Sequence, residues 1–217
     1  KAPTGYVIDP TVHTVTLNST TPIDVTFTNK QLKGAIEVIK VDANDNSNVL
    51  QGAEFTLFDS NGTAIKSEVT DERGIAKFTD LTYGSYSIKE TKAPAGYVLN
   101  NKSFPVEINE HGKTITITAE NSKIKGSVQI TKVDAQDNKK VLKGAEFTLF
   151  DLNGTAIETE VTDQNGIADF SNIEFGSYII RETKAPNGYL LTTQPFNVEI
   201  TKEGQTISFE VTNTKKV

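Results

Sequence analysis

The stretch IKETKAPAGY, from Ile88 to Tyr97, returns as IRETKAPNGY from Ile180 to Tyr189. Each copy joins a strand-like run ending in glutamate to an Ala-Pro-x-Gly-Tyr corner. Proline ends a hydrogen-bonded ladder, and glycine permits a turn that other residues resist. The same corner stands a third time at residues 1–6, as KAPTGY. The stretch therefore indicates a β module that is built more than once along the chain.

The sequence around this stretch repeats as well. KGAIEVIKVDAND at 33–45 matches KGSVQITKVDAQD at 125–137, and GAEFTLFD at 52–59 matches the identical run at 144–151. The offset is constant, with no insertion or deletion between the copies. A period of about 90 residues is too long for a solenoid and is typical of small independent domains in series.

We therefore predict two modules, at 31–123 and 124–217. Residues 1–30 match the last third of a module and are predicted to be the C-terminal part of a preceding one. Turn signals punctuate short runs rich in Val, Ile, Thr, Phe and Tyr, and no stretch has the pattern of an amphipathic helix. The predicted fold class is all-β, with each module a small antiparallel sandwich.

The composition excludes several classes of protein. The net charge of −6 is spread along the chain, which argues against a nucleic-acid binder. No run of about 18 apolar residues occurs, so the sequence predicts no membrane span. The absence of cysteine removes disulfides, thiol catalysis and Cys-ligated metals. An extracellular protein without disulfides would need another staple if it meets force or proteases.

Strand parity places one lysine of each module on the wrong face. Side chains alternate between the faces of a strand, so residues i, i+2 and i+4 share one. Each lysine continues an apolar stripe: Ile36, Val38 and Lys40 in the first module, and Val128, Ile130 and Lys132 in the second. We expect both lysines to point toward the core.

A glutamate and an asparagine follow the same rule. The glutamates end the stripes Tyr86, Ile88, Glu90 and Tyr178, Ile180, Glu182. The asparagines end the stripes Ile115, Ile117, Ala119, Asn121 and Ile207, Phe209, Val211, Asn213. One Lys, one Glu and one Asn per module therefore face the core by parity.

Burial changes the protonation states that the lysine and the glutamate favour. A buried lysine tends toward the neutral, nucleophilic amine, and a buried glutamate toward the protonated acid. Amine, carboxamide and proton-shuttling carboxyl can form an amide and release ammonia, which would be a Lys–Asn isopeptide bond. Two alternatives stay open at this point: solvated residues at strand ends, and an ordinary Lys–Glu ion pair.

The same residues carry a resemblance to the B-type repeat domain of Gram-positive collagen adhesins, which sortase-assembled pilins share. Four features match in each copy and together cover nearly the whole chain. They are the strand end K-V-D (40–42 and 132–134), G-A-x-F (52–55 and 144–147), E-x-x-A-P-x-G-Y (90–97 and 182–189) and the final Asn (121 and 213).

The resemblance implies an immunoglobulin-like β-sandwich with a self-formed isopeptide bond. Lys40 would join Asn121 with Glu90 as catalyst, and Lys132 would join Asn213 with Glu182. It implies no cofactor and no turnover enzyme, because each glutamate acts once on its own chain. A possible calcium loop, DANDN at 42–46, lacks the Gly and Glu that such loops need, so we expect a solvated turn and no metal.

Residues 1–30 depart from the pattern. Asn29 is expected to end a last strand that contains Ile23, Val25 and Phe27, but its Lys and Glu partners would precede residue 1. Asn29 is therefore an unpaired cross-link position. A lone hairpin is marginal, so we expect residues 1–30 to be frayed or to pair with another molecule.

Three functions are open from the sequence. The first is an extracellular stalk of a cell-wall-anchored surface protein, hardened by isopeptide bonds, with host extracellular-matrix protein bound through other domains. The second is an adhesin module that itself binds a matrix protein. The third is a segment of a sortase-polymerised pilin. The near-identity of the two copies favours the stalk.

Overall fold

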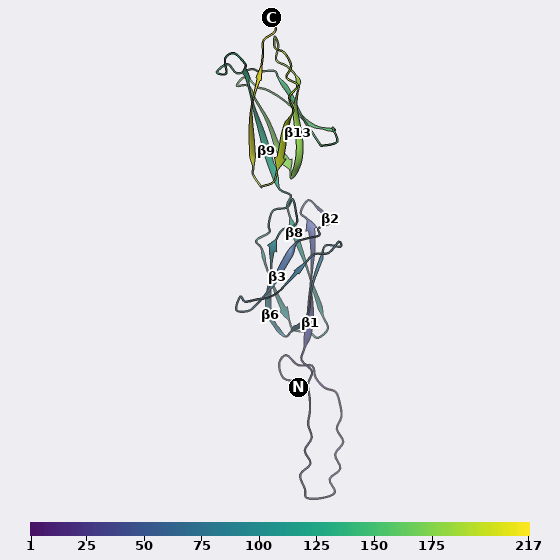
Figure 1. The fold of residues 1–217 in the computed structure, drawn as a ribbon. Helices are drawn as coiled ribbons and strands as arrows, with labels where there is room; N and C mark the ends of the chain where they lie inside the picture. Colours follow the sequence, from purple (N-terminus) through teal and green to yellow (C-terminus); the bar gives the residue numbers. More distant parts are fainter. The chain divides into compact units, whose positions relative to one another are not determined.

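A computed structural model describes all residues, 1–217, and contains fifteen strands and no helix (Figure 1). No segment therefore forms a helix long and apolar enough to cross a bilayer. The chain divides into two units. The first comprises Lys1–Ala95 and Leu99–Ser122, and the second comprises Gly96–Val98 and Lys123–Val217. The predicted all-β fold class is confirmed.

The first unit holds eight strands, from β1 to β8. They are β1 Lys33–Asp42, β2 Asp45–Val49, β3 Glu54–Asp59, β4 Ala64–Val69, β5 Ile75–Thr82, β6 Gly84–Lys92, β7 Ser103–Ile108 and β8 Thr114–Asn121. The second unit holds seven. They are β9 Lys125–Asp134, β10 Glu146–Phe150, β11 Ala156–Val161, β12 Ile167–Glu174, β13 Gly176–Lys184, β14 Phe196–Ile200 and β15 Thr206–Asn213.

Two sheets face each other in each unit. In the first, β1 lies beside β2, β5 and β8, opposite a sheet ordered β4-β3-β6-β7. In the second, the order β12-β9-β15 faces β11-β10-β13-β14. β2 has no counterpart strand; only a bridge between Val133 and Val141 marks its place. The other strands of the second unit have the same order and pairing as those of the first.

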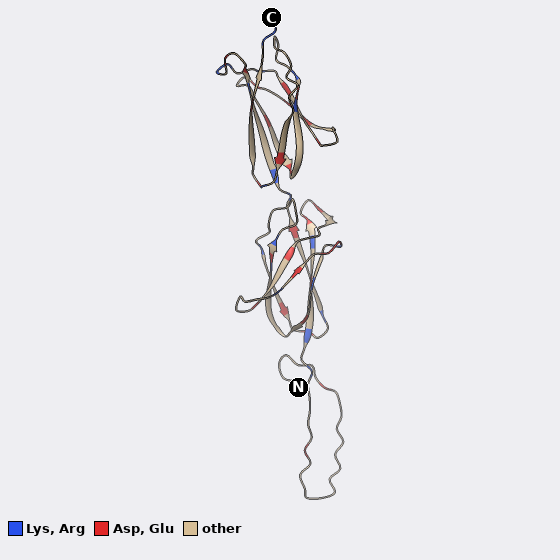
Figure 2. Cartoon of the chain, viewed as in Figure 1, with Lys and Arg blue, Asp and Glu red and all other residues tan.

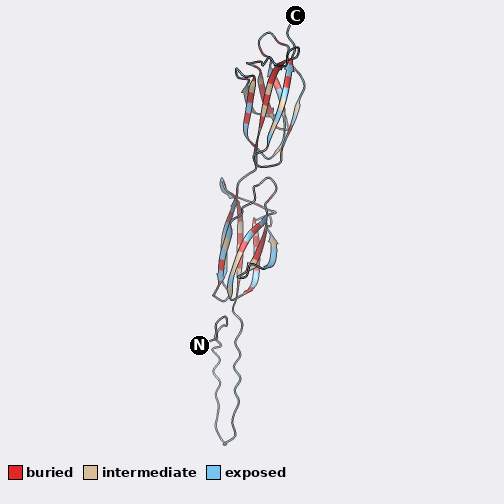
Figure 3. Cartoon of the chain, turned by 90° about the vertical axis from the view of Figure 1, so that its left-hand side faces the viewer, coloured by how far each residue is buried: buried red, intermediate tan, exposed pale blue.

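The apolar stripes of the facing sheets form one core per unit. Figure 3 shows buried positions alternating with exposed ones along the strands. The first core is centred on Ile36, Val38, Phe55, Phe78 and Ile88. The second is centred on Val128, Ile130, Phe147, Phe170 and Ile180. The period-2 pattern thus places the predicted core faces inward.

The sandwiches are not purely antiparallel, and this corrects the expectation from sequence. β1 pairs with β8 in parallel, and β9 pairs with β15 in parallel. A parallel pair needs a long connection, and here the rest of the module supplies it. The first and last strands of each module are consequently neighbours that run in the same direction.

Residues 7–30 form no regular strand, although Ile23, Val25 and Phe27 were expected in one. No strand pairs with these residues and no sheet packs on them, so Phe27 is 65% exposed. The segment is tied to the first unit at its base, where Tyr6 forms a bridge with Gln31.

Charged residues of both signs are scattered over the strands and loops of each unit (Figure 2). No group of three or more His, Cys, Asp or Glu side chains could hold a metal ion. The expected solvated turn at 42–46 is wrong in part. Asp42 closes β1 and is buried, and Asp45 begins β2, so only Ala43 and Asn44 turn.

Candidate functional site

The two lysines singled out by parity are fully buried. Lys40 and Lys132 are each 0% exposed, at the end of the stripes that supply Ile36, Val38, Val128 and Ile130 to the cores. The main chain around each lysine is fixed on both sides. For example, Lys40 N donates to Gly74 O at 2.8 Å, and Leu50 N donates to Lys40 O at 2.8 Å. The reading of these lysines as solvated strand-end residues is therefore wrong.

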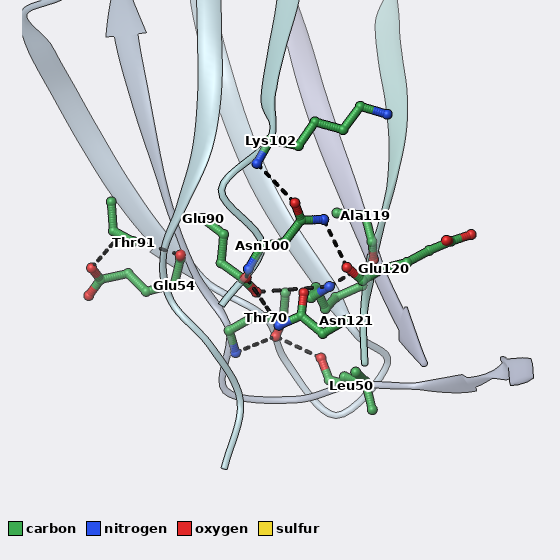
Figure 4. A network of polar contacts seen from close by, with 12 residues as sticks. Leu50, Glu54, Thr70, Glu90, Thr91, Asn100, Lys102, Ala119, Glu120 and Asn121 are labelled. Carbon is green, nitrogen blue, oxygen red and sulfur yellow. Dashed lines mark hydrogen bonds and ion pairs between the residues drawn. The ribbon is translucent and has the colours of Figure 1, made fainter. Parts of the chain in front are cut away.

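Glu90 and Asn121 reach the same point from the two sheets of the first unit (Figure 4). Glu90 comes from β6 of the facing sheet, and Asn121 ends β8 beside the strand of Lys40. Asn121 Nδ2 donates to both carboxyl oxygens of Glu90 at 3.0 Å. Lys40 Nζ lies 3.8 Å from Glu90 Oε1. One amine, one carboxyl and one carboxamide thus share a buried site.

The second unit repeats the site. Asn213 Nδ2 donates to Glu182 Oε1 at 2.9 Å and Oε2 at 3.1 Å, and Lys132 Nζ lies 3.5 Å from Glu182 Oε1. Lys132 Nζ also contacts Asn213 Oδ1 directly. The structure therefore brings together both sets of three residues that parity grouped.

The parallel register explains why the lysine and asparagine meet. Lys40 is level with Ala119, and Asp42 is level with Asn121. Asn121 thus stands two residues further along its strand, which returns its side chain to the face of Lys40. In the second unit Lys132 is level with Val211, two residues before Asn213.

The sites differ in one contact. In the first unit Lys40 Nζ donates to the main-chain oxygen of Ala119 at 3.0 Å, and Asn121 Oδ1 is buried without a hydrogen-bond partner. In the second unit the corresponding carbonyl oxygen, Asn213 Oδ1, accepts from Lys132. The first carboxamide carbonyl is thus free to accept a proton or a hydrogen bond.

Burial shifts the pKa of both lysines and of Glu90 toward their uncharged forms. Desolvation lowers the pKa of Lys40 from 10.5 to about 8, against the opposing attraction of Glu90. Desolvation raises the pKa of Glu90, against hydrogen bonds from the Asn100 main chain and the Asn121 side chain. Desolvation likewise lowers the pKa of Lys132 to about 8. In the first unit, burial thus lowers the cost of the neutral amine and of the protonated carboxyl relative to water.

Sequence reasoning missed the main-chain donors that hold each glutamate. Asn100 N donates to Glu90 Oε2 at 2.7 Å, and Thr192 N donates to Glu182 Oε2 at 2.8 Å. The residue types differ between the copies, but the contact to the glutamate comes from the backbone in both. No pattern of residue types could therefore have revealed them.

The Ala-Pro-x-Gly-Tyr corner is fixed to the same end of the module. In the second unit Tyr189 is buried, and its hydroxyl donates to Asp134 Oδ2 at 2.7 Å. Asp134 stands two residues after Lys132, so the corner braces the strand that carries the amine. Tyr189 thus anchors the corner to the end of β9.

Asn29, the unpaired position, lies apart from such a site. Its side-chain amide donates to Val7 O at 2.8 Å, within the N-terminal segment.

Comparison with known proteins gives a consistent picture. The family model described as SpaA, prealbumin-like fold domain, matches residues 34–123 and again 126–215. Serine-aspartate repeat-containing protein F of Staphylococcus epidermidis is 34% identical over 169 residues, which cover 69% of this chain and 10% of that protein.

Two solved structures add to this. The Bacillus anthracis TIE protein superposes with a TM-score of 0.90 at 38% identity, over 99% of this chain and 41% of that one. A C-terminal fragment of the pilus adhesin SpaC from Lactobacillus rhamnosus GG superposes with a TM-score of 0.53 at 18% identity, over 84% of this chain and 98% of that one, which shows a shared fold. The chain spans a tenth of the staphylococcal relative and under half of the Bacillus anthracis protein.

Proposed function

The chain belongs to the family of SpaA prealbumin-like fold domains, two of which it carries in tandem, and from this premise we propose that it is a stalk segment of a Gram-positive cell-surface protein. In this proposal each domain is closed by an isopeptide bond, Lys40 to Asn121 and Lys132 to Asn213. Membership in the family agrees with the resemblance to B-type adhesin repeats that the sequence carries. The kinship with a staphylococcal serine-aspartate repeat protein supports a place outside the cell.

The observation that carries the proposal is a buried amine, carboxyl and carboxamide at the same point of both domains. Isolated buried charges are costly, and an ion pair would keep both the lysine and the glutamate charge buried. Formation of an amide removes the lysine charge altogether. The burial that makes the lysine and the glutamate costly as ions thus favours the reaction with the asparagine.

The proposed step is balanced within the three side chains. The neutral Lys40 Nζ attacks Cγ of Asn121 and forms a C–N bond, while the bond from Cγ to Nδ2 breaks. Glu90 gives its proton to the departing Nδ2 and takes one from the lysine nitrogen, so it ends as it began. One ammonia leaves. The hydrogen bonds from Nδ2 to both Glu90 oxygens, at 3.0 Å, place the acid where the leaving group needs it.

The position of the bond gives it a mechanical role. Tension enters a domain at the start of β1 and leaves at the end of β8, and these two strands are neighbours. A bond from Lys40 to Asn121 passes the tension directly between them, so the residues from 41 to 120 carry none. A disulfide would do the same, but an amide cannot be reduced. This supports a stalk rather than a ligand-binding module.

The intact mass of the denatured protein tests the proposal. Each bond releases one ammonia, so the mass is expected about 17 Da below the calculated value per bond and about 34 Da below it for both. Glu90→Ala with Glu182→Ala should restore the full calculated mass of that variant. A tryptic peptide pair that joins Lys40 to Asn121 would locate the first bond.

A matched control uses exposed glutamates of the strands next to β6 and β13. Glu107→Ala with Glu199→Ala removes two carboxylates from β7 and β14, which face solvent. This variant should keep the deficit. If the unaltered protein has its full calculated mass, the proposed cross-links do not form, and the two sites are only buried polar networks.

A further inference from the structure

The Ala-Pro-x-Gly-Tyr corner occurs three times, and in two copies its glycine lies against an aromatic ring. Within the first unit a Cβ at Gly5 would lie 3.3 Å from Cβ of Tyr83. Within the second, a Cβ at Gly96 would lie 3.1 Å from Cδ1 of Phe175. Both aromatic residues directly precede the Gly-Ser pair that starts β6 or β13. The two contacts are therefore at equivalent positions of the repeat.

Main-chain hydrogen bonds accompany each ring. Leu32 N donates to Gly5 O at 2.7 Å, and Tyr83 N donates to Leu32 O at 3.3 Å. Ile124 N donates to Gly96 O at 2.8 Å, and Phe175 N donates to Ile124 O at 2.9 Å. An apolar residue thus bridges the glycine carbonyl to the aromatic amide in both places.

The third corner, at Gly188, makes the same main-chain hydrogen bond, but no aromatic ring lies against its glycine. Lys216 N donates to Gly188 O at 2.9 Å, but no atom lies within 4 Å of a Cβ at Gly188. Gly188 is exposed where Gly5 and Gly96 are half-buried. The adjoining Leu190 is 52% exposed, whereas Val98, at the same place of the second corner, is half-buried. An open hollow of about 1070 Å³ includes Pro186, Gly188 and Leu190 in its wall.

The charged residues beside each corner indicate which kind of partner the third corner can bind. At the second corner Lys123 Nζ lies 2.9 Å from Glu174 Oε2, the residue before Phe175. At the first corner the corresponding residues are Gln31 and Thr82, which carry no charge. At the third, Lys215 takes the place of Lys123, since each forms a bridge with the tyrosine of its corner. Lys215 Nζ lies 3.7 Å from Asp134 and is 60% exposed.

We propose that the surface around Gly188 is a docking socket for a further domain of this family, joined in tandem after the second. Its ligand is the turn before that domain's counterpart of β6, with the sequence acidic–aromatic–Gly–Ser. The aromatic ring covers Gly188 and Leu190, and the acidic side chain pairs with Lys215. The socket does not depend on the cross-links, since none of its contacts involves the buried lysines.

The test extends the chain by one domain. A copy of residues 125–217 placed directly after Lys216 keeps Lys215 and Lys216 and reproduces the spacing between Asn121 and Lys125. The chain has no cysteine, so Leu190→Cys introduces a single thiol that reports the cover on the socket. Labelling of this thiol by a maleimide is expected to be slower by about tenfold or more in the extended chain than in the original.

Two controls decide whether the turn is responsible. The extended chain with Phe175→Ala in the copy should label as fast as the original chain, and Ile65→Cys, on an exposed strand of the first unit, should label equally fast in both lengths. Equal labelling at Leu190→Cys in the original and extended chains would overturn the socket. So would slowing that survives Phe175→Ala in the copy.

A second measurement covers the case in which Leu190→Cys disturbs the fold. Hydrogen exchange of residues 187–190 in the cysteine-free chains is expected to slow on extension, and the copy with Phe175→Ala should reverse this. Unchanged exchange would contradict the proposal independently of the thiol.

Discussion

At the scale of single residues, the protein places a lysine, a glutamate and an asparagine where apolar side chains would ordinarily stand. Lys40 and Lys132 are among the largest fully buried side chains of the chain, beside Phe55 and Phe147. Each lysine occupies a core position without a full hydration shell, and desolvation is the first cause of its lowered pKa. The proposed reaction removes this desolvation cost, because it converts the lysine amine into an uncharged amide.

The lowered lysine pKa predicts a pH dependence of stability when the bond cannot form. In the variant Asn121→Ala with Asn213→Ala, both lysines stay as amines with a folded-state pKa of about 8, against 10.5 when unfolded. Between these values the unfolded chain binds more protons, so the free energy of unfolding should rise with pH from about 8 to 10.5. The full gain is about 3 kcal/mol per lysine.

Urea unfolding of this variant and of the unaltered protein at several pH values checks this. If the proposed bonds form, the lysines of the unaltered protein are amides in both states and do not titrate, so the difference between the two proteins isolates the lysines. A difference that stays flat between pH 8 and 10.5 would mean that the lysines are protonated in the fold.

At the scale of elements, the end of β1 is held by the turn that leads into β5. Gly74 has a φ of +71°, and a Cβ there would lie 2.8 Å from Lys40 O and 2.8 Å from Val49 Cβ. Gly74 O also accepts the hydrogen bond from Lys40 N. The turn therefore sets the position of the lysine main chain, and only glycine fits it.

Gly74→Ala should lower the stability of the first domain more than a substitution at another left-handed glycine. Gly112 has a φ of +75° and open space around its Cβ position, so Gly112→Ala carries only the conformational cost, about 1–2 kcal/mol. Gly74→Ala adds a steric cost of roughly 1–3 kcal/mol. Thermal unfolding of both variants in the Asn121→Ala background compares them. Equal losses would show that the β1 end can shift to make room.

The comparison of the two domains at this scale shows which elements the site needs. β2 is present in the first domain and absent from the second, yet the lysine, glutamate and asparagine meet in both. The site depends instead on the parallel pair of first and last strands and on the strand that brings the glutamate across.

At the scale of the whole molecule, the parallel pairing of first and last strands sets which ends of a domain the proposed cross-links join. Lys132 and Asn213 are 81 residues apart in sequence, and a closed loop of that size stabilises by about 4–5 kcal/mol in the chain-entropy model. The thermodynamic gain is shared by any cross-link of that span. The mechanical gain depends on where the two ends lie.

Single-molecule stretching should reveal this difference. With both bonds formed, the sandwiches should show no unfolding step, because tension bypasses the residues between each cross-linked pair. In Glu90→Ala with Glu182→Ala, each domain should unfold and lengthen by roughly 270 Å, the extended length of residues 41–120 at 3.3–3.6 Å per residue. The control variant, Glu107→Ala with Glu199→Ala, keeps both proposed bonds and should show no unfolding step. Steps of that length in the unaltered protein would contradict the proposed force path.

Much of this protein could be predicted from local patterns. The repeat was visible because the copies share long identical runs, and the β class because turn residues divide short apolar runs. Parity grouped Lys40, Glu90 and Asn121 because side-chain direction depends only on position along a strand. Residues 23–29 show the limit of the same rule: their alternation indicates a strand, but a strand needs a neighbour to pair with, and none pairs with these residues.

The sequence by itself determined the repeat, the strands, and the inward faces of the three reactive side chains, since these follow from the order of neighbouring residues. Only the tertiary structure decided that β1 lies beside β8 in parallel, that Asn121 stands two residues beyond the level of Lys40, and that the Asn100 main chain holds Glu90. The reason is physical. The period of two specifies the face of a strand but not its partner or register, and those are chosen by the packing of segments about 80 residues apart.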